Sequence, residues 1–160
     1  MDCIIREAEI QDMVNVLALI KELANFENEP DAVVIDKSDL IKHGFSEKPL
    51  FKIFVAELKE EIVGMVLFYP RYSTWKGETL HLEDLIVKQE KRSLGIGKAL
   101  YTRFLEYAYE QKVKRVEWVV LDWNKNAIEF YKKTGANILK DWRTVQMHEK
   151  ALNEFITSKK

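Results

Sequence analysis

The sequence lacks disulfide pairs, thiolate clusters for zinc and long apolar segments, the features that stabilise small chains or anchor them in membranes. Cysteine occurs once among 160 residues, at Cys3, so no disulfide forms within the chain and thiolates alone cannot build a zinc cluster. The longest nearly unbroken apolar run, Ile62 to Tyr69, is far shorter than the ~20 residues that cross a bilayer. No basic segment followed by an apolar core opens the chain. We therefore expect a cytoplasmic protein that does not enter membranes.

Charge of one sign is not in excess either. Lys+Arg 25 oppose Asp+Glu 26, which gives a net charge of −1 and no surplus of cations to bind nucleic-acid phosphates. Hydrophobic residues make up 47% and charged residues 32%, as in globular proteins rather than disordered ones. No repeat, low-complexity stretch or Gly/Ser linker interrupts the chain. We expect one domain over residues 1–160.

Hydrophobic periodicity predicts alternating helices and strands. Apolar positions at helical spacing indicate helices at 10–25 and 97–111, while Ser38 and Asn124 fit as N-caps of helices that end at Gly44 and Thr134. Aromatic and β-branched runs indicate strands, with a loop at 70–77 and a last short helix at 151–156. The expected strands are 3–6, 51–58, 62–69, 79–87, 116–121 and 142–147.

This order of elements predicts an α/β (α+β) fold. Three strands in quick succession are typical of an antiparallel meander, and the strand–helix–strand that follows is typical of a parallel crossover. A mixed, mostly antiparallel sheet flanked by helices accommodates both.

The segment 88–98 has the composition of an anion-binding loop. It joins a strand to the start of a helix, where unpaired N–H groups and the helix dipole favour an anion, and it contains Gly95, Gly97 and several cations. It is neither a P-loop nor a dinucleotide fingerprint, because Arg92 and Leu100 occupy positions where those motifs require glycine. Taken alone, two such glycines also fit a tight turn that leads into a helix.

Arg92 to Gly97 form an Arg-x-x-Gly-x-Gly pattern after Leu85-Ile86-Val87, and this resembles the GNAT superfamily of acetyl-CoA-dependent N-acetyltransferases. The order of elements agrees, and residues 124–136 look like the family's Asn…Tyr…Gly-Ala/Phe segment. Within the superfamily the sequence resembles the diamine (spermidine/spermine N1-) acetyltransferase group at 19–24, 43–45, 82–84, 122–124 and 142–143. Residues 72–77 and 120–124 look more like its thialysine N-epsilon-acetyltransferase subgroup.

The resemblance implies acetyl-CoA as co-substrate and a bulge in the central strand that opens a slot for the thioester. No His/Cys/Asp spacing resembles a metal site, so we expect no metal. In this family the loop amides wrap the coenzyme A pyrophosphate, and strand backbone pairs with the pantetheine arm. Carried over residue by residue, the expected coenzyme A contacts are Leu85, Ile86, Val87, Arg92, Ser93, Leu94, Gly95, Ile96, Gly97, Lys98, Asn124, Lys125, Asn126, Ala127, Tyr131 and Lys133.

Acetyl transfer to an amine needs a base and an acid. An alkyl amine has a pKa near ~10, so roughly one molecule in a thousand is neutral at pH 7, and a carboxylate can take the proton directly or through water. Glu83, in the Leu-Glu-Asp segment, is the candidate base, and Tyr131 is the candidate acid that protonates the thiolate. In the alternative interpretation Glu83 and Asp84 are surface acids and Tyr131 packs its helix onto the sheet. Adjacent strand residues point to opposite faces unless a bulge intervenes.

A cationic substrate calls for acids and aromatic rings along its channel. The resemblance places Glu27 in the amine pocket and Phe26 where polyamine-type members carry an aromatic hydroxyl. The expected substrate contacts are Phe26, Glu27, Trp75, Glu83, Asp84 and Trp142. His81 precedes Glu83 by two residues and either assists proton removal or is a plain polar strand residue.

We therefore expect an enzyme that acetylates the primary amine of a small cationic substrate, a diamine or polyamine or a lysine-like amine such as thialysine. The amine would attack acetyl-CoA directly in a ternary complex, because Cys3 is the only thiol and lies in the first strand. The alternatives are a non-catalytic coenzyme A-binding or sensing domain, and an acetyltransferase for a protein amine or an antibiotic. The resemblance also implies a homodimer. The balanced charge and the short apolar runs lead us to expect no nucleic-acid or membrane partner.

Overall fold

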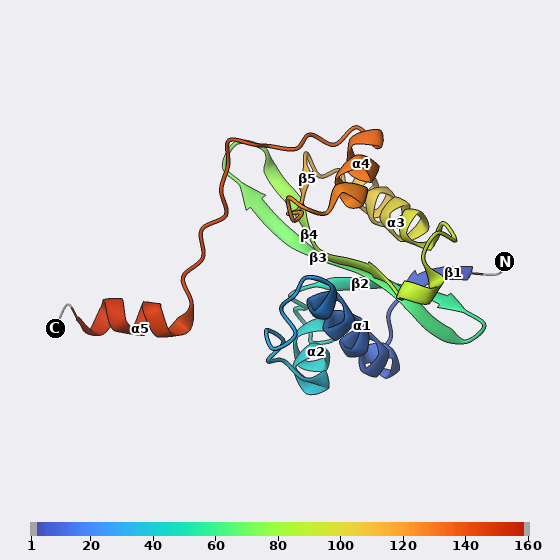
Figure 1. Cartoon of the computed structure of the whole chain (residues 1–160), viewed down its shortest axis with the longest axis horizontal. Helices are drawn as coiled ribbons and strands as arrows, with labels where there is room; N and C mark the ends of the chain where they lie inside the picture. Colours follow the sequence, from blue (N-terminus) through green and yellow to red (C-terminus); the bar gives the residue numbers. More distant parts are fainter. Residues whose placement is uncertain (1–2, 159–160) are drawn as a thin grey trace. The chain divides into compact units, whose positions relative to one another are not determined.

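A five-stranded sheet organises the first of two compact units into which the chain divides between Val119 and Val120. The computed structural model describes residues 3–158. The strands lie side by side in chain order, and every neighbouring pair is antiparallel except β4 and β5, which are parallel (Figure 1). Their bounds are β1 Cys3–Glu7, β2 Lys52–Leu58, β3 Glu61–Ser73, β4 Gly77–Val87 and β5 Val116–Glu117.

Helices cover both faces of this sheet. Helices α1 (Met13–Phe26, after the 3-10 turn η1, Ile10–Asp12) and α2 (Lys37–Gly44) lie on one face, and α3 (Ile96–Glu110, after the 3-10 turn η2, Gln89–Lys91) lies on the other (Figure 1). Met13, Val16 and Leu19 of α1 pack in one core cluster with Val55 and Met65 of the sheet. On the α3 face the rings of Phe104 and Phe68 lie 5.0 Å apart.

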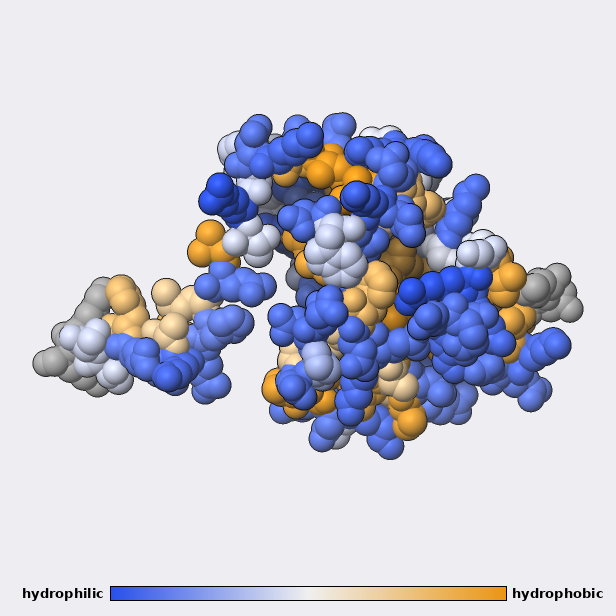
Figure 2. Space-filling view, viewed as in Figure 1, coloured by the Kyte–Doolittle hydropathy of each residue, from blue (hydrophilic) through white to orange (hydrophobic). Residues whose placement is uncertain are grey.

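The second unit contains helices α4 (Lys125–Lys133) and α5 (Glu149–Thr157). Asn124 caps α4, because its Oδ1 accepts the backbone N–H of Ala127 at 3.2 Å. Helix α5 is amphipathic and exposes Leu152, Phe155 and Ile156. Figure 2 shows apolar surface on this helix beside hydrophilic surface. Over residues 3–158, none of the helices has both the length and the apolar character of a membrane span.

The predicted fold class is confirmed: the sheet is mixed and mostly antiparallel, and β4–α3–β5 is the expected parallel crossover. The predicted helices at 10–25, 97–111, 124–134 and 151–156 all form, each with its ends shifted by a few residues and the first beginning as a 3-10 turn.

Four local predictions were wrong. Helix α2 is capped by Asp36 instead of Ser38, because the Asp36 carboxylate accepts the N–H groups of both Ser38 and Asp39. Residues 70–77 are mostly strand, since β3 and β4 pair as far as Ser73 opposite Gly77. The strand at 116–121 shrinks to two residues, and 142–147 form no strand because no partner strand within residues 3–158 takes up their backbone hydrogen bonds.

A β-bulge interrupts the pairing of β3 with β4, as the resemblance implied. Leu67 pairs with Asp84 and Phe68 pairs with Leu82, so Glu83 is an extra residue with no partner on β3. A bulge of this kind bends the strand and redirects its side chains.

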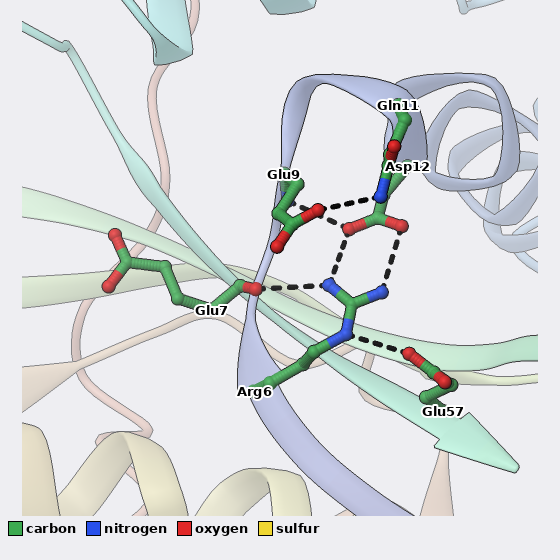
Figure 3. Close-up of polar contacts among 6 residues, drawn as sticks. All are labelled: Arg6, Glu7, Glu9, Gln11, Asp12 and Glu57. Carbon is green, nitrogen blue, oxygen red and sulfur yellow. Dashed lines mark hydrogen bonds and ion pairs between the residues drawn. The ribbon is translucent and has the colours of Figure 1, made fainter. Parts of the chain in front are cut away.

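An ion-pair network joins the first strand to its neighbours (Figure 3). The guanidinium of Arg6 binds both carboxylate oxygens of Asp12, at 2.7 and 3.0 Å, and its Nε donates to Glu57 at 2.7 Å. Asp12 is only 5% exposed and also accepts the N–H of Glu9 at 2.8 Å. Burial alone raises the pKa of Asp12, but the hydrogen bonds from Arg6 and Glu9 outweigh it and leave the pKa below its usual value. Arg6 thus ties β1 to β2 and to the turn that begins α1.

We predict that Asp12→Asn lowers the free energy of unfolding at pH 7 by about 2–3 kcal/mol, because it leaves Arg6 without its bidentate partner. Since the folded-state pKa of Asp12 is depressed, its stabilisation is complete above the unfolded pKa and is lost as pH falls toward the folded pKa. The difference from wild type should be constant from pH 7 to 5 and shrink below pH ~4. Urea unfolding followed by tryptophan fluorescence measures it.

Glu7→Gln is the matched control, because Glu7 forms an exposed ion pair with Lys52. It should cost about 0–1 kcal/mol. Equal losses for both variants would contradict a structural role for the Asp12 network.

Candidate active site

The bulge in β4 gathers acidic side chains on the face that α1 covers. Leu67 and Tyr69 of β3 pack against the α1 core, and cross-strand partners lie on the same face of a sheet. Asp84 pairs with Leu67 and His81 pairs with Tyr69, so Asp84 and His81 share this face. The extra residue Glu83 also turns toward it, as its contacts show.

Glu83 lies against Tyr69 and His81. The hydroxyl of Tyr69 donates to Glu83 Oε2 at 2.9 Å, and His81 Nε2 lies 3.7 Å from the same oxygen. The rings of Tyr69 and His81 are 5.2 Å apart and tilted by 30°. Burial, followed by the hydrogen bond to Glu83, raises the pKa of Tyr69 to about 12, so Tyr69 keeps its proton and remains a donor.

Asp84 is the most strongly perturbed acid of the group. Desolvation first, and then the negative charges of Glu83 and Glu27, raise its pKa to about 6. Glu27 is the residue that caps the C-terminus of α1, and desolvation raises its pKa as well. A group of acids that oppose one another's ionisation in this way is typical of a site that binds a cation or moves a proton.

The loop between β4 and α3 is shaped to receive an anion. Gly95 is the residue before α3 and has φ of 82°, a left-handed conformation that a side chain would strain. The first-turn N–H groups of Ile96, Gly97 and Lys98 have no acceptor within the helix. A Cβ added at Gly97 would meet only Val87 Cγ2, at 3.6 Å, so packing within the chain does not require glycine there.

Helix α1 contacts this loop as well as the acidic group. Arg92 Nε donates to the carbonyl of Val87 at 3.1 Å, and its guanidinium lies 5.1 Å from the centre of the Phe26 ring. The backbone N–H of Gln89 donates to Glu22 of α1 at 3.0 Å. The end of α1 therefore connects the predicted coenzyme A loop with the predicted amine pocket.

One edge of β4 is open beside the bulge. Strand β5 pairs with β4 only at Leu80 and His81. Within residues 3–158, no strand covers the edge of β4 from Leu82 to Val87. Backbone groups at Leu85 and Val87 can therefore pair with an extended ligand in the way that a strand pairs with a sheet edge.

Comparison with known proteins agrees with this geometry. The Acetyltransferase (GNAT) family profile matches residues 15–136. The chain is 38% identical to a Bos taurus thialysine N-epsilon-acetyltransferase, over 94% of this chain and 95% of that one. It is 36% identical to the Homo sapiens spermidine/spermine N(1)-acetyltransferase-like protein 1, over 82% of this chain and 20% of that one. Among solved structures, an integron cassette protein from V. cholerae superposes with a TM-score of 0.79 at 21% identity, covering 98% of each chain.

The chain belongs to the GNAT acetyltransferase family. It is therefore an enzyme of acetyl transfer, and the alternative of a non-catalytic coenzyme A sensor is set aside. The part of the chain that the structure describes holds no group of three or more His, Cys, Asp or Glu placed to bind a metal ion.

The remaining predicted site residues of this GNAT protein lie in both units. Asn124 and the α4 residues Lys125, Asn126, Ala127, Tyr131 and Lys133 belong to the second unit, where Tyr131 is only 8% exposed. Trp142 belongs to the same unit and is 69% exposed. Trp75 lies in the turn between β3 and β4 and is 79% exposed, so no pocket encloses its ring. Roles for these residues stay predictions.

Tyr69 is a site residue that the sequence analysis missed. The sequence indicates Tyr69 only as the end of an apolar strand, and its hydrogen bond to Glu83 depends on the register of β3 against β4. Tyr69 ends the apolar run that pairs with the strand containing Leu-Glu-Asp. Its nearness to Glu83 can be recognised only when these two strands are aligned.

We predict that Asp84→Asn stabilises the folded protein at pH 7 by about 1–2 kcal/mol, after allowance for solvent screening. Because the folded-state pKa of Asp84 is raised to about 6, its ionisation opposes folding, and wild-type stability falls as pH rises from ~4 to 6. The variant lacks this loss, so the gap should open between pH 4 and 6 and then stay constant.

Urea unfolding at pH 4, 5, 6 and 7 measures the gap, with Asp31→Asn as the control because Asp31 is an exposed loop acid. The control should follow wild type within about 0.5 kcal/mol. A destabilised Asp84→Asn at pH 7 would contradict the raised pKa.

Proposed function

We propose that the protein transfers the acetyl group of acetyl-CoA to a primary amine of a small cationic substrate, a diamine, polyamine or lysine-like amine such as thialysine. The observation that carries this proposal is the group of three acids, Glu27, Glu83 and Asp84, at a bulge next to an open strand edge and an anion-binding loop. The negative charge of these three acids attracts an ammonium group, and their carboxylates provide an acceptor for its proton.

Acetyl-CoA fits the residues of the loop between β4 and α3. The amides at the start of α3 and the cations Arg92 and Lys98 suit a pyrophosphate, and the free edge of β4 suits the amide groups of a pantetheine arm. Glycine at position 97, where packing leaves room for a side chain, supports a close approach of ligand to backbone.

The names of the relatives support a small amine as acceptor, because they specify thialysine and spermidine/spermine. In the proposed reaction the amine attacks the thioester directly, and Tyr131 donates a proton to the leaving thiolate. We further propose that both units form one acetyltransferase domain over residues 1–160, since the family match at 15–136 runs through the boundary between them. A homodimer is proposed on the resemblance to the diamine acetyltransferases.

We predict that the purified protein releases coenzyme A thiol from acetyl-CoA when it is given putrescine, spermidine, lysine or thialysine, and less with a peptide amino terminus. Tyr131→Phe should lower kcat by about 10²-fold or more, because the thiolate loses its acid. Phe130→Leu, a change to the neighbouring ring that spares the hydroxyl, is the control. Tight coenzyme A binding without turnover of any amine would overturn the proposed function.

We also predict that Gly97→Ala separates stability from coenzyme A binding. The added Cβ makes only an ordinary contact and alanine favours the helix, so the free energy of unfolding should stay the same or rise by up to ~1 kcal/mol. The KM for acetyl-CoA should rise about tenfold or more, because the methyl group occupies the space of the phosphate.

Thr102→Ala, an exposed change farther along α3, should leave both the stability and the KM close to wild type. Gly64→Ala should instead lower the free energy of unfolding, since its Cβ would lie 2.8 Å from the carbonyl oxygen of Ile86. An unchanged KM in Gly97→Ala would count against a pyrophosphate at the start of α3.

A further inference from the structure

Two arginines lie on the same face of the sheet as the acids of the candidate site. We propose that Arg71, supported by Arg115, binds a carboxylate of the acceptor, so that the preferred acceptor is an amino acid whose side chain ends in the reacting amine. This assignment rests on the proposed function and narrows its substrate class, because diamines and polyamines carry no carboxylate.

The register of β3 against β4 places Arg71 beside the acidic group. Tyr69 pairs with His81, and Arg71 pairs with Thr79. Residues two apart on a strand point to the same face, so Arg71 shares the face of Tyr69 and lies roughly 7 Å farther along the strand. Tyr69 is the last residue of β3 that packs against the α1 core, and the side chain of Arg71 is 55% exposed. Arg71 therefore stands at the open end of this face.

Strand β5 adds the second arginine through a shared carboxylate. Glu117 of β5 is the registered neighbour of His81. Its Oε1 forms an ion pair with Nη1 of Arg71, and its Oε2 lies 2.9 Å from Nε of Arg115. One carboxylate thus lies between two guanidinium groups, which leaves the cluster with one positive charge in excess.

The cluster retains donors for a ligand. In the part of the chain that the structure describes, Glu117 is the only acid within ion-pair distance of either arginine. Oε1 of Glu117 and Nε of Arg115 are buried, yet neither makes a hydrogen bond of regular geometry there. A guanidinium carries several N–H donors, and each printed ion pair occupies one nitrogen of its arginine. A second carboxylate can therefore bind the remaining donors of Arg71 without displacing Glu117.

Tyr69 connects the arginine cluster with the acids. Its hydroxyl donates to Glu83 at 2.9 Å. Burial dominates the raised pKa of Tyr69, and among the smaller effects the charge of Arg71 lowers that pKa, so Arg71 is within electrostatic reach of the same hydroxyl. An extended lysine separates its side-chain nitrogen from its carboxylate by roughly 7 Å, close to the rise of two strand residues. Its two ends can thus meet the acids and Arg71 at once.

The signs of the charges make this arrangement selective. A diamine of the same length would direct its second ammonium at the arginines, and like charges repel. A carboxylate in that place gains charge-assisted hydrogen bonds, which are worth about 10- to 100-fold in affinity. The cluster therefore favours an acceptor with a carboxylate and disfavours one with a second amine.

The test measures kcat/KM by thiol release with acceptors of matched length. Lysine is compared with 6-aminohexanoate, which keeps the carboxylate but lacks the α-amine, and with cadaverine, which lacks the carboxylate. Wild type should acetylate both carboxylates about tenfold or more better than cadaverine. Arg71→Gln should lose about 10- to 100-fold in kcat/KM with both carboxylates, mainly through KM, and change by less than about threefold with cadaverine.

Three further variants separate binding from a structural role. Arg71→Lys keeps the charge but not the planar fork, so it should recover part of the loss. Glu117→Gln keeps both arginines and removes their internal carboxylate, so its KM for lysine should stay the same or fall. Lys76→Gln removes an equal charge from the exposed turn between β3 and β4 and is the control. Urea unfolding shows whether each variant is folded.

A loss in Arg71→Gln that is equal for cadaverine and lysine, or equal to the loss in Glu117→Gln, would overturn the carboxylate site and leave the proposed function standing. Wild type that prefers cadaverine to lysine would do the same, even if Arg71→Gln failed to fold. A wild-type protein that binds coenzyme A but acetylates no amine would overturn the proposed function itself, so the two failures differ in the activity of the wild type.

Discussion

The extra residue in β4 is the constraint on which the site depends. Without it, Glu83 and Asp84 would point to opposite faces of the sheet, and one of them would be driven into the core beneath α3. The bulge lets Glu83 reach Tyr69 while Asp84 stays opposite Leu67, so both acids serve the face that α1 covers. The bulge also lies beyond the point where the pairing of β4 with β5 ends. The backbone groups on that edge of β4 are therefore not paired with a strand.

Helix α1 gives the bulge its electrostatic character. Its C-terminal residues place Glu27 near Asp84 and the ring of Phe26 over Arg92. The loop between β4 and α3 and the acids of the candidate site thereby both contact the end of one helix. The N-terminal end of α1 is fixed by the Arg6–Asp12 ion pair, in which a buried carboxylate has a bidentate partner. The C-terminal end of the same helix instead holds Glu27 close to other acids. Such unfavourable contacts persist only where the surrounding fold enforces them.

The sequence predicted most elements because their signals are local. Asn124 caps α4, Gly95 precedes α3, and the apolar stripe of α1 faces the core, each as its own residues indicate. The errors concern non-local pairing: residues 70–77 became strand through pairing across the hairpin, and 142–147 formed none without a partner strand. Asp36 displaced Ser38 as a cap because a carboxylate accepts two N–H groups there.

The sequence by itself determined the family and indicated the loop and the acids of the candidate site, since these depend on residue types at fixed spacings along the chain. Only the tertiary structure decided how those acids differ. The register of β3 against β4 brings Tyr69 and His81 to Glu83, and the packing of α1 removes water from Asp84 and adds the charge of Glu27. Desolvation and through-space charge depend on residues far apart in sequence, and no spacing along the chain records them.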